Sequence, residues 1–297
     1  MSDIAVIGAG KWGYALYSAI KRQNCNIVIT SRTPRNIEGF VTLEVALASP
    51  YLVLAIPAQE IGAWLREHFV YQGQKVLVVA KGIEAGSGRF LNEIFETCIP
   101  SENLAYLSGP SFAAEVIQSL PTAVVINSHN PELAEVFGTF FPDFMKTYYS
   151  TDVIGAEVCG AYKNVIAIAA GICEGLHLGK NAAASLIARG LVEMQRFGKS
   201  YGACDESFIG LSGAGDLFLT ASSTMSRNFR VGLGIAQGKS QELILRELSE
   251  VAEGIGTAYA LQKIAQQKAL YLPIAREVYN MLEGKDPQDS LRDLLSQ

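Results

Sequence analysis

The sequence has few of the residues from which metal sites, disulfide frameworks and histidine-based catalysts are built. Only three histidines occur in the 297 residues, and the five cysteines are an odd number without a CxxC pair. This pattern indicates reduced thiols, and no group of His, Asp or Glu residues has the spacing of metal ligands. We therefore expect neither a metal site nor structural disulfides.

Strong net charge and membrane-length apolar runs are missing as well. The formal charge is −5 and charged residues make up 18% of the chain, so the sequence predicts no general attraction to nucleic acid. The longest apolar stretches, such as 165–173, are shorter than the roughly 20 residues that cross a bilayer. The first predicted strand begins at Ile4, which leaves no room for a signal sequence. We expect a cytoplasmic protein that does not insert into membranes.

A glycine-rich turn near the N-terminus is the first feature that points to a ligand. The apolar run Ile4–Ile7 is typical of a buried strand and leads into Gly8, Gly10 and Gly13, a GxGxxG pattern that opens a predicted helix. In dinucleotide-binding folds the first glycine permits the turn, the second admits a pyrophosphate and the third lets helix and strand pack closely. We predict a dinucleotide site, with a ligand-free turn or another nucleotide-like ligand as the alternatives.

The end of the second predicted strand bears on which dinucleotide is bound. An acidic residue there would pair with the adenosine ribose hydroxyls, but the sequence has Ser31 and Arg32, with Arg35 nearby as a second candidate. A hydroxyl and a guanidinium suit a 2′-phosphate, so NADP(H) is favoured and NAD(H) stays open. The alternatives for Arg32 are a solvated loop charge or a planar group stacked on adenine.

Short apolar strands alternate with amphipathic helices through the first half of the chain. The predicted strands lie near 4–8, 26–30, 51–56, 75–80, 103–107, 121–127 and 144–149. Such alternation predicts an α/β domain with a largely parallel sheet, whereas helical spacing dominates from about 155 to 295. The sequence therefore predicts a dinucleotide-binding domain over 1–150 and a helical domain over 151–297.

Two lysines occupy positions suited to chemistry. Lys163 lies in a nearly chargeless run from Gly160 to Ala170, and an ammonium taken out of water has a lowered pKa. Lys81 directly follows a predicted strand, where ligands of parallel sheets bind. The alternatives are a lysine whose charge reaches water from an apolar helix and an ordinary loop lysine.

Three further segments have polar side chains that could bind a ligand, or small residues that would let the backbone approach one. A carboxylate, Asp216, follows two glycines in 213–216, and the run 226–228 (Ser-Arg-Asn) offers donors that suit a phosphate. The run 109–113 follows a strand and would bring backbone amides close to a ligand. The alternatives are a helix cap, a surface charge and a tight turn in which Ser111 caps a helix.

Seven segments together resemble the NAD(P)-dependent glycerol-3-phosphate dehydrogenases of the bacterial type. They are GAGKWG at 8–13, AKGIE at 80–84, SGPSFAAEV at 108–116, GAYKNVIAIAAG at 160–171, GLSGAGDLFLT at 210–220, SRN at 226–228 and VAEG at 251–254. They stand in the family's order and cover nearly the whole chain. The resemblance implies an N-terminal Rossmann-like domain with a mostly parallel sheet and an all-α domain like that of 6-phosphogluconate dehydrogenase.

The resemblance also implies an activity, namely the interconversion of dihydroxyacetone phosphate and glycerol 3-phosphate for phospholipid synthesis. Lys163 is then the acid/base, Asp216 orients it, and Lys81 polarises the carbonyl. The residues implied for the substrate are Lys81, Gly109, Ser111, Lys163, Asp216, Ser226, Arg227 and Asn228. Those implied for the cofactor are Gly8, Gly10, Lys11, Trp12, Gly13, Arg32, Lys81, Ala113, Arg227, Val251 and Glu253. No histidine falls in a candidate motif, which favours lysine as the proton carrier.

One departure from the family pattern and two alternative functions remain. Only some twenty residues separate the second and third strands, a shorter excursion than the family has, which bears on the adenosine contacts. A related dehydrogenase acting on another small hydroxy acid would not need Arg227 and Asn228. A non-catalytic NADP(H) sensor would not need Lys163. The large helical part is compatible with a homodimer.

Overall fold

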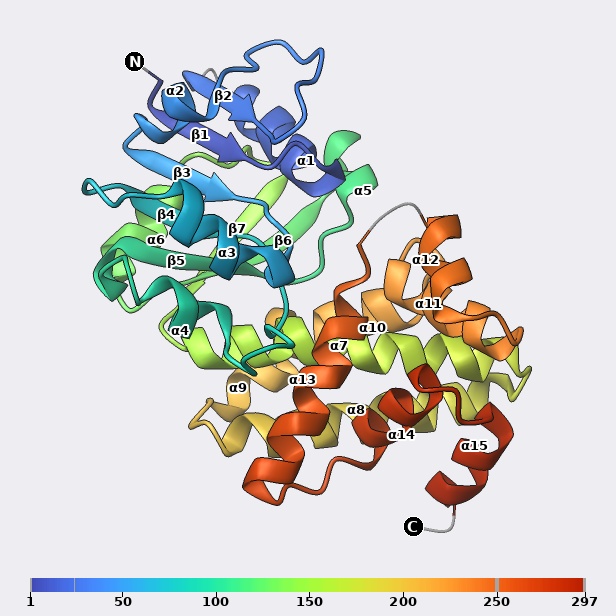
Figure 1. Ribbon diagram of the computed structural model, residues 1–297. Coiled ribbons are helices and arrows are strands. Elements are labelled where there is room, and N and C mark those ends of the chain that lie inside the picture. Colours follow the sequence, from blue (N-terminus) through green and yellow to red (C-terminus); the bar gives the residue numbers. More distant parts are fainter. Residues whose placement is uncertain (1, 24, 249–250, 296–297) are drawn as a thin grey trace. The chain divides into compact units, whose positions relative to one another are not determined.

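The computed structural model describes residues 2–23, 25–248 and 251–295, and the chain forms two compact units (Figure 1). The sheet unit comprises residues 1–80 and 92–156, and the helical unit comprises residues 81–91 and 157–297. The predicted division into 1–150 and 151–297 differs from these units at residues 81–91 and stays a prediction.

The described part of the sheet unit contains a seven-stranded sheet in the order β2-β1-β3-β4-β5-β6-β7. The strands are β1 (Ile4–Ile7), β2 (Ile27–Thr30), β3 (Tyr51–Leu54), β4 (Lys75–Val78), β5 (Leu104–Ser108), β6 (Thr122–Asn127) and β7 (Met145–Ser150). Neighbouring strands are parallel except for β5 and β6, which are antiparallel. The expectation of a mostly parallel sheet is therefore confirmed.

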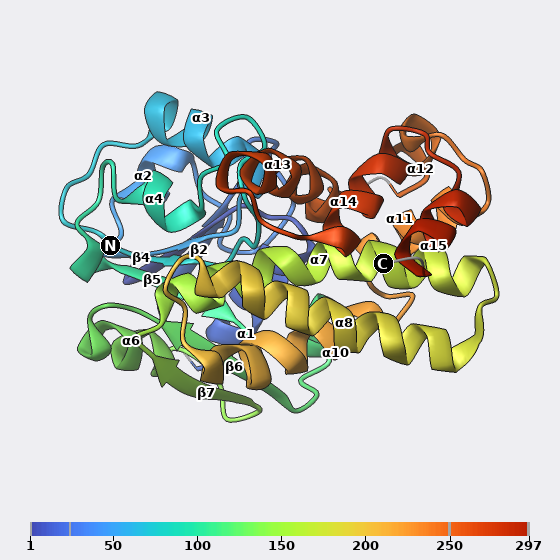
Figure 2. The same ribbon diagram turned by 90° about the horizontal axis from the view of Figure 1, so that it is seen from below.

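Helices cover both sides of this sheet. They are α1 (Lys11–Lys21), α2 (Leu43–Leu47), α3 (Ala58–His68), α4 (Leu91–Phe95), the 3-10 turn η1 (Ser101–Asn103), α5 (Ala113–Ile117) and α6 (Pro131–Gly138). Figure 2 shows α2, α3 and α4 on the side of the sheet opposite to α6. Alternate residues such as Ile4 and Val6 of β1 pack in one core with Leu16 of α1 and Phe137 of α6, because successive strand side chains point to opposite faces.

The strands predicted from the sequence are confirmed to within two residues at each end. An asparagine followed by a proline is typical of a helix start, and Asn130 caps α6, since its side chain accepts a hydrogen bond from the Leu133 N–H and Pro131 occupies the first turn. Asp286 likewise accepts from the Gln288 N–H at the start of the last helix. Ser111 does not cap α5, because Phe112 stands at the cap position.

The helical unit is built around two long neighbouring helices (Figure 2). Its elements are α7 (Val153–Gly175), α8 (Gly179–Lys199), α9 (Asp205–Ile209), the π-helical turn η2 (Leu211–Gly215), α10 (Asp216–Ala221), α11 (Arg227–Ala236), α12 (Gln241–Leu248), α13 (Glu253–Lys268), α14 (Pro273–Leu282) and α15 (Pro287–Leu295). Buried Tyr162 of α7 donates to Glu193 of α8 at 2.7 Å, and Glu193 also accepts from the first turn of α14.

Within the described residues, α7 is the one helix long and apolar enough to cross a membrane. However, 94% of its most apolar window is buried inside the protein. The helix is therefore apolar because it forms the core of the helical unit.

Candidate active site

Two lysines of the helical unit meet at one carboxylate. Asp216 is 1% exposed, and its Oδ1 accepts from Lys163 Nζ at 2.6 Å while its Oδ2 accepts from Lys81 Nζ at 2.7 Å. Lys163 also donates to Thr220 Oγ1 at 2.9 Å. The structure thus brings together the three residues that the sequence put forward for catalysis.

The electrostatics of this cluster favour a lysine that can exchange a proton. Burial removes the Lys163 ammonium from water and lowers its pKa from 10.5 to about 8, although Asp216 favours the charged form. The positive charges of Lys81 and Arg227 act in the same direction as burial. For Asp216, burial favours the neutral acid, but the two ammonium groups outweigh it and hold its pKa below the ordinary value.

The π-helical turn η2 sets the position of Asp216. In this turn the Gly215 N–H donates to the Gly210 carbonyl, five residues back, and α10 starts immediately after it. π-turns are frequent at functional sites. A Cβ on Gly213 would lie 2.2 Å from the Phe208 carbonyl oxygen, so this turn has no room for a side chain there.

Lys81 reaches the cluster from the 81–91 hairpin, the segment Lys81–Leu91 that follows β4. Ile83 and Phe90 form an antiparallel bridge, and buried Phe90 packs edge-on against Tyr201 with ring centroids 5.0 Å apart. The Leu91 N–H donates to Glu157 at 2.8 Å. These contacts make the hairpin, and therefore Lys81, part of the helical unit.

The predicted phosphate-binding run 226–228 lies at the start of α11. Ser226 caps the helix by accepting from the Phe229 N–H, while Arg227 is exposed. Buried Asn228 donates to Asn164 Oδ1 at 2.9 Å and accepts from the Gly254 N–H at 3.0 Å. Asn228 therefore joins α7, α11 and α13, and these contacts with described residues use one of its two amide hydrogens.

The glycine motif of the sheet unit has the geometry that a dinucleotide requires. Gly8 has φ +110°, and a Cβ on Gly13 would lie 1.8 Å from the Gly8 carbonyl oxygen, so both positions need glycine. A Cβ on Gly10, in contrast, would meet nothing within 4 Å. The open side of Gly10 can admit a phosphate group next to the start of α1.

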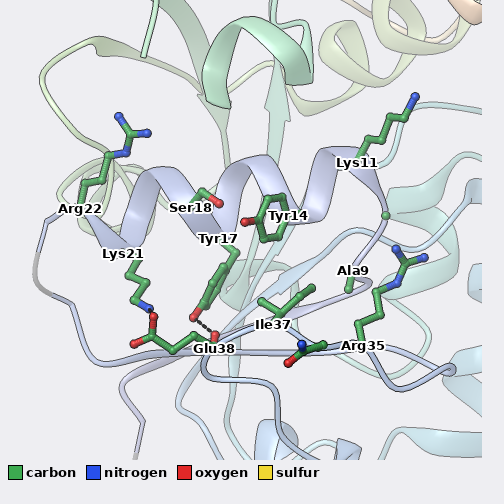
Figure 3. A pocket seen from close by; sticks show the side chains of 12 residues that line it. Ala9, Lys11, Tyr14, Tyr17, Ser18, Lys21, Arg22, Arg35, Ile37 and Glu38 are labelled. Atoms are coloured by element: carbon green, nitrogen blue, oxygen red, sulfur yellow. Dashed lines mark hydrogen bonds and ion pairs between the residues drawn. The ribbon is translucent and has the colours of Figure 1, made fainter. Parts of the chain in front are cut away.

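A cavity of about 760 Å³ adjoins this motif within the sheet unit. It extends from Ala9, Gly10 and Lys11 along α1 to the segment 35–38 (Figure 3). Its volume lies within the range of about 300–1,000 Å³ that is typical of small-molecule sites.

The remaining predicted residues lie in several places. In the sheet unit, Gly109 has φ +99°, and the Ser111 hydroxyl donates to the Gly109 carbonyl. Ala113 begins α5. Trp12 packs against the core, and Arg32 is exposed. In the helical unit, Val251 is exposed and Glu253 begins α13. The structure does not bring these residues together into one cluster within either unit.

Two residues that contact the predicted site residues, Thr220 and Asn164, were not predicted from the sequence. Thr220 stands four residues after Asp216, so both side chains lie on one face of α10, and its hydroxyl also donates to Asp216 at 3.3 Å. Asn164 follows Lys163 directly. The i,i+4 spacing could have suggested Thr220, whereas nothing in the sequence indicates that Asn164 meets Asn228. Among the described residues, no group of three or more His, Cys, Asp or Glu side chains could hold a metal ion.

Comparisons with known proteins give the same family for both parts of the chain. The sequence patterns of the N-terminal and C-terminal parts of NAD-dependent glycerol-3-phosphate dehydrogenase match residues 32–134 and 152–292. The chain is 72% identical over 296 residues to glycerol-3-phosphate dehydrogenase (NAD(P)+) of Sulfurimonas denitrificans, covering 100% of both chains. It is 56% identical over 292 residues to the protein of that name from a Nitratiruptor species, covering 98% of this chain and 97% of the other. The crystal structure of glycerol-3-phosphate dehydrogenase from Coxiella burnetii is similar with a TM-score of 0.92 at 30% identity, over 100% of this chain and 99% of that one.

Proposed function

Because the chain belongs to the NAD-dependent glycerol-3-phosphate dehydrogenase family, we infer that it interconverts dihydroxyacetone phosphate and glycerol 3-phosphate with a nicotinamide cofactor. One observation carries the assignment of its chemistry, namely the buried Lys163 ammonium held by Asp216 and Thr220 beside Lys81. A ketone that accepts a hydride at carbon must gain a proton at oxygen, and the Lys163 ammonium of this cluster can donate that proton.

We propose that Lys163 gives its Nζ proton to the C2 oxygen during reduction and takes it back during oxidation. With a pKa of about 8, the amine can act in both directions near neutral pH. Asp216 fixes the position of Nζ and offsets one of the two lysine charges. Lys81 polarises the carbonyl, since its positive charge favours the negative charge that develops on oxygen.

We propose that the substrate phosphate is bound by residues at the start of α11. Arg227 is exposed and close enough to influence the pKa of Lys163, and a guanidinium can bind a phosphate through two hydrogen bonds. Ser226, Asn228, Gly109 and Ser111 remain predicted substrate contacts.

The sheet unit would hold the cofactor, which supplies a hydride at the nicotinamide ring. The open side of Gly10 and the N-terminus of α1 fit a pyrophosphate, and the adjoining cavity fits an adenosine group. Gly8, Lys11, Trp12, Gly13 and Arg32 stay predicted contacts from this unit, as do Ala113 and, from the helical half, Val251 and Glu253. The relatives carry NAD(P)+ in their names, and we propose that this chain accepts both NADP(H) and NAD(H).

We propose that the protein is soluble, since the one membrane-length apolar helix among its described residues is buried core. We propose that it acts in the cytoplasm, that glycerol 3-phosphate from this reaction supplies glycerophospholipid synthesis, and that it assembles as a homodimer. The net charge of −5 supports none of the attractions that nucleic acids or anionic membranes require.

A direct assay tests the proposed reaction. Purified protein is mixed with dihydroxyacetone phosphate and either NADPH or NADH, and the loss of reduced-nicotinamide absorbance is followed. We expect NADPH and NADH both to be oxidised with dihydroxyacetone phosphate. With unphosphorylated dihydroxyacetone we expect almost no oxidation, because that compound lacks the phosphate that Arg227 would bind. Oxidation that is equally fast without the phosphate would favour a dehydrogenase for another hydroxy compound. Cofactor binding without any oxidation would favour a sensor.

A further inference from the structure

The cavity beside the glycine motif is positively charged. Four cations line it, namely Lys11, Lys21, Arg22 and Arg35, and Glu38 is the one acidic residue among the described lining residues. Two tyrosines, Tyr14 and Tyr17, complete the side formed by α1 (Figure 3). This composition suits an anionic ligand that also carries an apolar or aromatic part.

Most of these cations already have partners within the protein. Lys21 forms an ion pair with Glu38 at 2.8 Å, which also neutralises the acid, and Arg22 donates to the Ile117 carbonyl at 3.0 Å. Lys11 also has an interaction with the rest of the chain. Within the described part of the chain, the Arg35 guanidinium makes no hydrogen bond or ion pair.

Arg35 lies at the end of the cavity where the cofactor pyrophosphate would bind. Figure 3 shows Arg35 beside Ala9, near the start of α1, whereas the Lys21–Glu38 pair lies at the opposite end. The pyrophosphate would sit against Gly10, so the adenosine ribose would lie within a few ångströms of that point. Arg32 and Arg35 are both exposed, but only Arg35 lines the cavity.

We propose that Arg35, rather than Arg32, is the residue that distinguishes NADP(H) from NAD(H), by binding the 2′-phosphate of the adenosine ribose. The inference rests on the proposed use of a nicotinamide dinucleotide and adds the residue that selects between the two. A guanidinium without an intramolecular partner binds a phosphate without first breaking an ion pair. Arg35 therefore adds binding energy for NADPH that NADH, which has a hydroxyl at the same place, cannot obtain.

Matched substitutions of the two arginines test this proposal. Dissociation constants for NADPH and NADH are measured by nicotinamide fluorescence, without substrate, for the unchanged protein, Arg35→Gln, Arg35→Lys and Arg32→Gln. We expect Arg35→Gln to weaken NADPH about 10-fold to 100-fold and NADH less than about threefold, as for loss of hydrogen bonds to a charged group. Arg35→Lys should give a smaller loss for NADPH, because the charge remains but the two-point contact is gone. Arg32→Gln should change the two constants by the same factor.

A control and a second probe make the result decisive. Arg66→Gln, an exposed arginine on α3 of the same unit, should change neither constant. Adenosine 2′,5′-bisphosphate should displace NADH from the unchanged protein and at least tenfold less effectively from Arg35→Gln. Equal loss of NADPH and NADH in Arg35→Gln, or a selective loss in Arg32→Gln alone, would overturn the proposal. If the unchanged protein bound neither cofactor, the proposed function itself would fail, and the two failures are thus distinguishable.

Discussion

At the scale of single residues, the central feature is a carboxylate shared by two lysines. Each oxygen of Asp216 is bonded to one ammonium, Lys163 or Lys81, so the cluster carries one net positive charge when both lysines are protonated. A buried charge of this kind is tolerated because an opposite charge and hydrogen bonds accompany it. Burial, with the charge of Lys81, keeps the pKa of Lys163 low although Asp216 raises it, and the hydrogen bond to Asp216 holds the Lys163 ammonium in a fixed place.

The pKa of Lys163 predicts the pH dependence of the reaction. Reduction needs the protonated amine, so kcat for dihydroxyacetone phosphate should fall as the pH rises through about 8. Oxidation of glycerol 3-phosphate needs the neutral amine, so its kcat should rise over the same interval. Steady-state rates at saturating substrate from pH 6 to 10 measure both limbs. A flat reduction profile up to pH 10 would show that Lys163 does not supply the proton.

The charge of Lys81 should influence the pKa of Lys163. Its positive charge favours the neutral form of Lys163, and its removal also leaves Asp216 to pair with Lys163 alone. Lys81→Met should therefore move the alkaline limb of the reduction profile to higher pH, besides lowering kcat. Lys199→Met, which removes an exposed lysine paired with Asp205, should leave the limb where it is. An unmoved limb in Lys81→Met would contradict the electrostatic coupling.

At the scale of elements, the sequence predicted the strands but not the π-helical turn or the contact between two helices beside the site. The strands could be predicted because each is a short apolar run bounded by turn residues, and Asn130-Pro131 marked a helix start by its chemistry. The π-turn before Asp216 could not be predicted, since glycine spacing alone does not distinguish it from a loop. The Asn228–Asn164 bond likewise depends on the packing of α11 against α7, which no local pattern encodes.

Substitution of Gly213 tests whether the π-helical turn η2 positions Asp216. Gly213→Ala should displace η2, because the new Cβ would meet the Phe208 carbonyl oxygen at 2.2 Å, and Asp216 should move with it. We expect kcat to fall at least about tenfold, since small misplacements of catalytic groups are costly. Gly86→Ala is the control, because a Cβ there meets nothing within 4 Å. Equal kcat values in the two variants would show that η2 does not set the position of Asp216.

At the scale of the whole molecule, the chain does not divide its units at a single point. The 81–91 hairpin follows a strand of the sheet, yet Phe90 is buried against Phe197 and Tyr201 in the helical unit. From the sequence, Lys81 was expected at the sheet edge because it follows β4. Its place in the helical unit follows from long-range packing of the hairpin, which the local sequence does not reveal.

Hydrogen exchange can test this placement of the hairpin. Phe90→Ala removes a fully buried ring, a change that typically costs about 3–5 kcal/mol. Amide exchange should accelerate in α8, which carries Phe197, and stay unchanged in β1 and β3. Faster exchange confined to the sheet would contradict the assignment of the hairpin to the helical unit.

We propose that the two units have different tasks, with the sheet unit holding the cofactor and Lys163 of the helical unit carrying the proton. Lys163→Met separates the two tasks most directly, because methionine fills the same apolar space without an ionisable group. We expect kcat for dihydroxyacetone phosphate reduction to fall by about 10² to 10⁴ while the dissociation constants of NADPH and NADH stay within about twofold. Turnover that persists at the original rate, or a loss of cofactor affinity as large as the loss of turnover, would contradict the claim that Lys163 carries the proton.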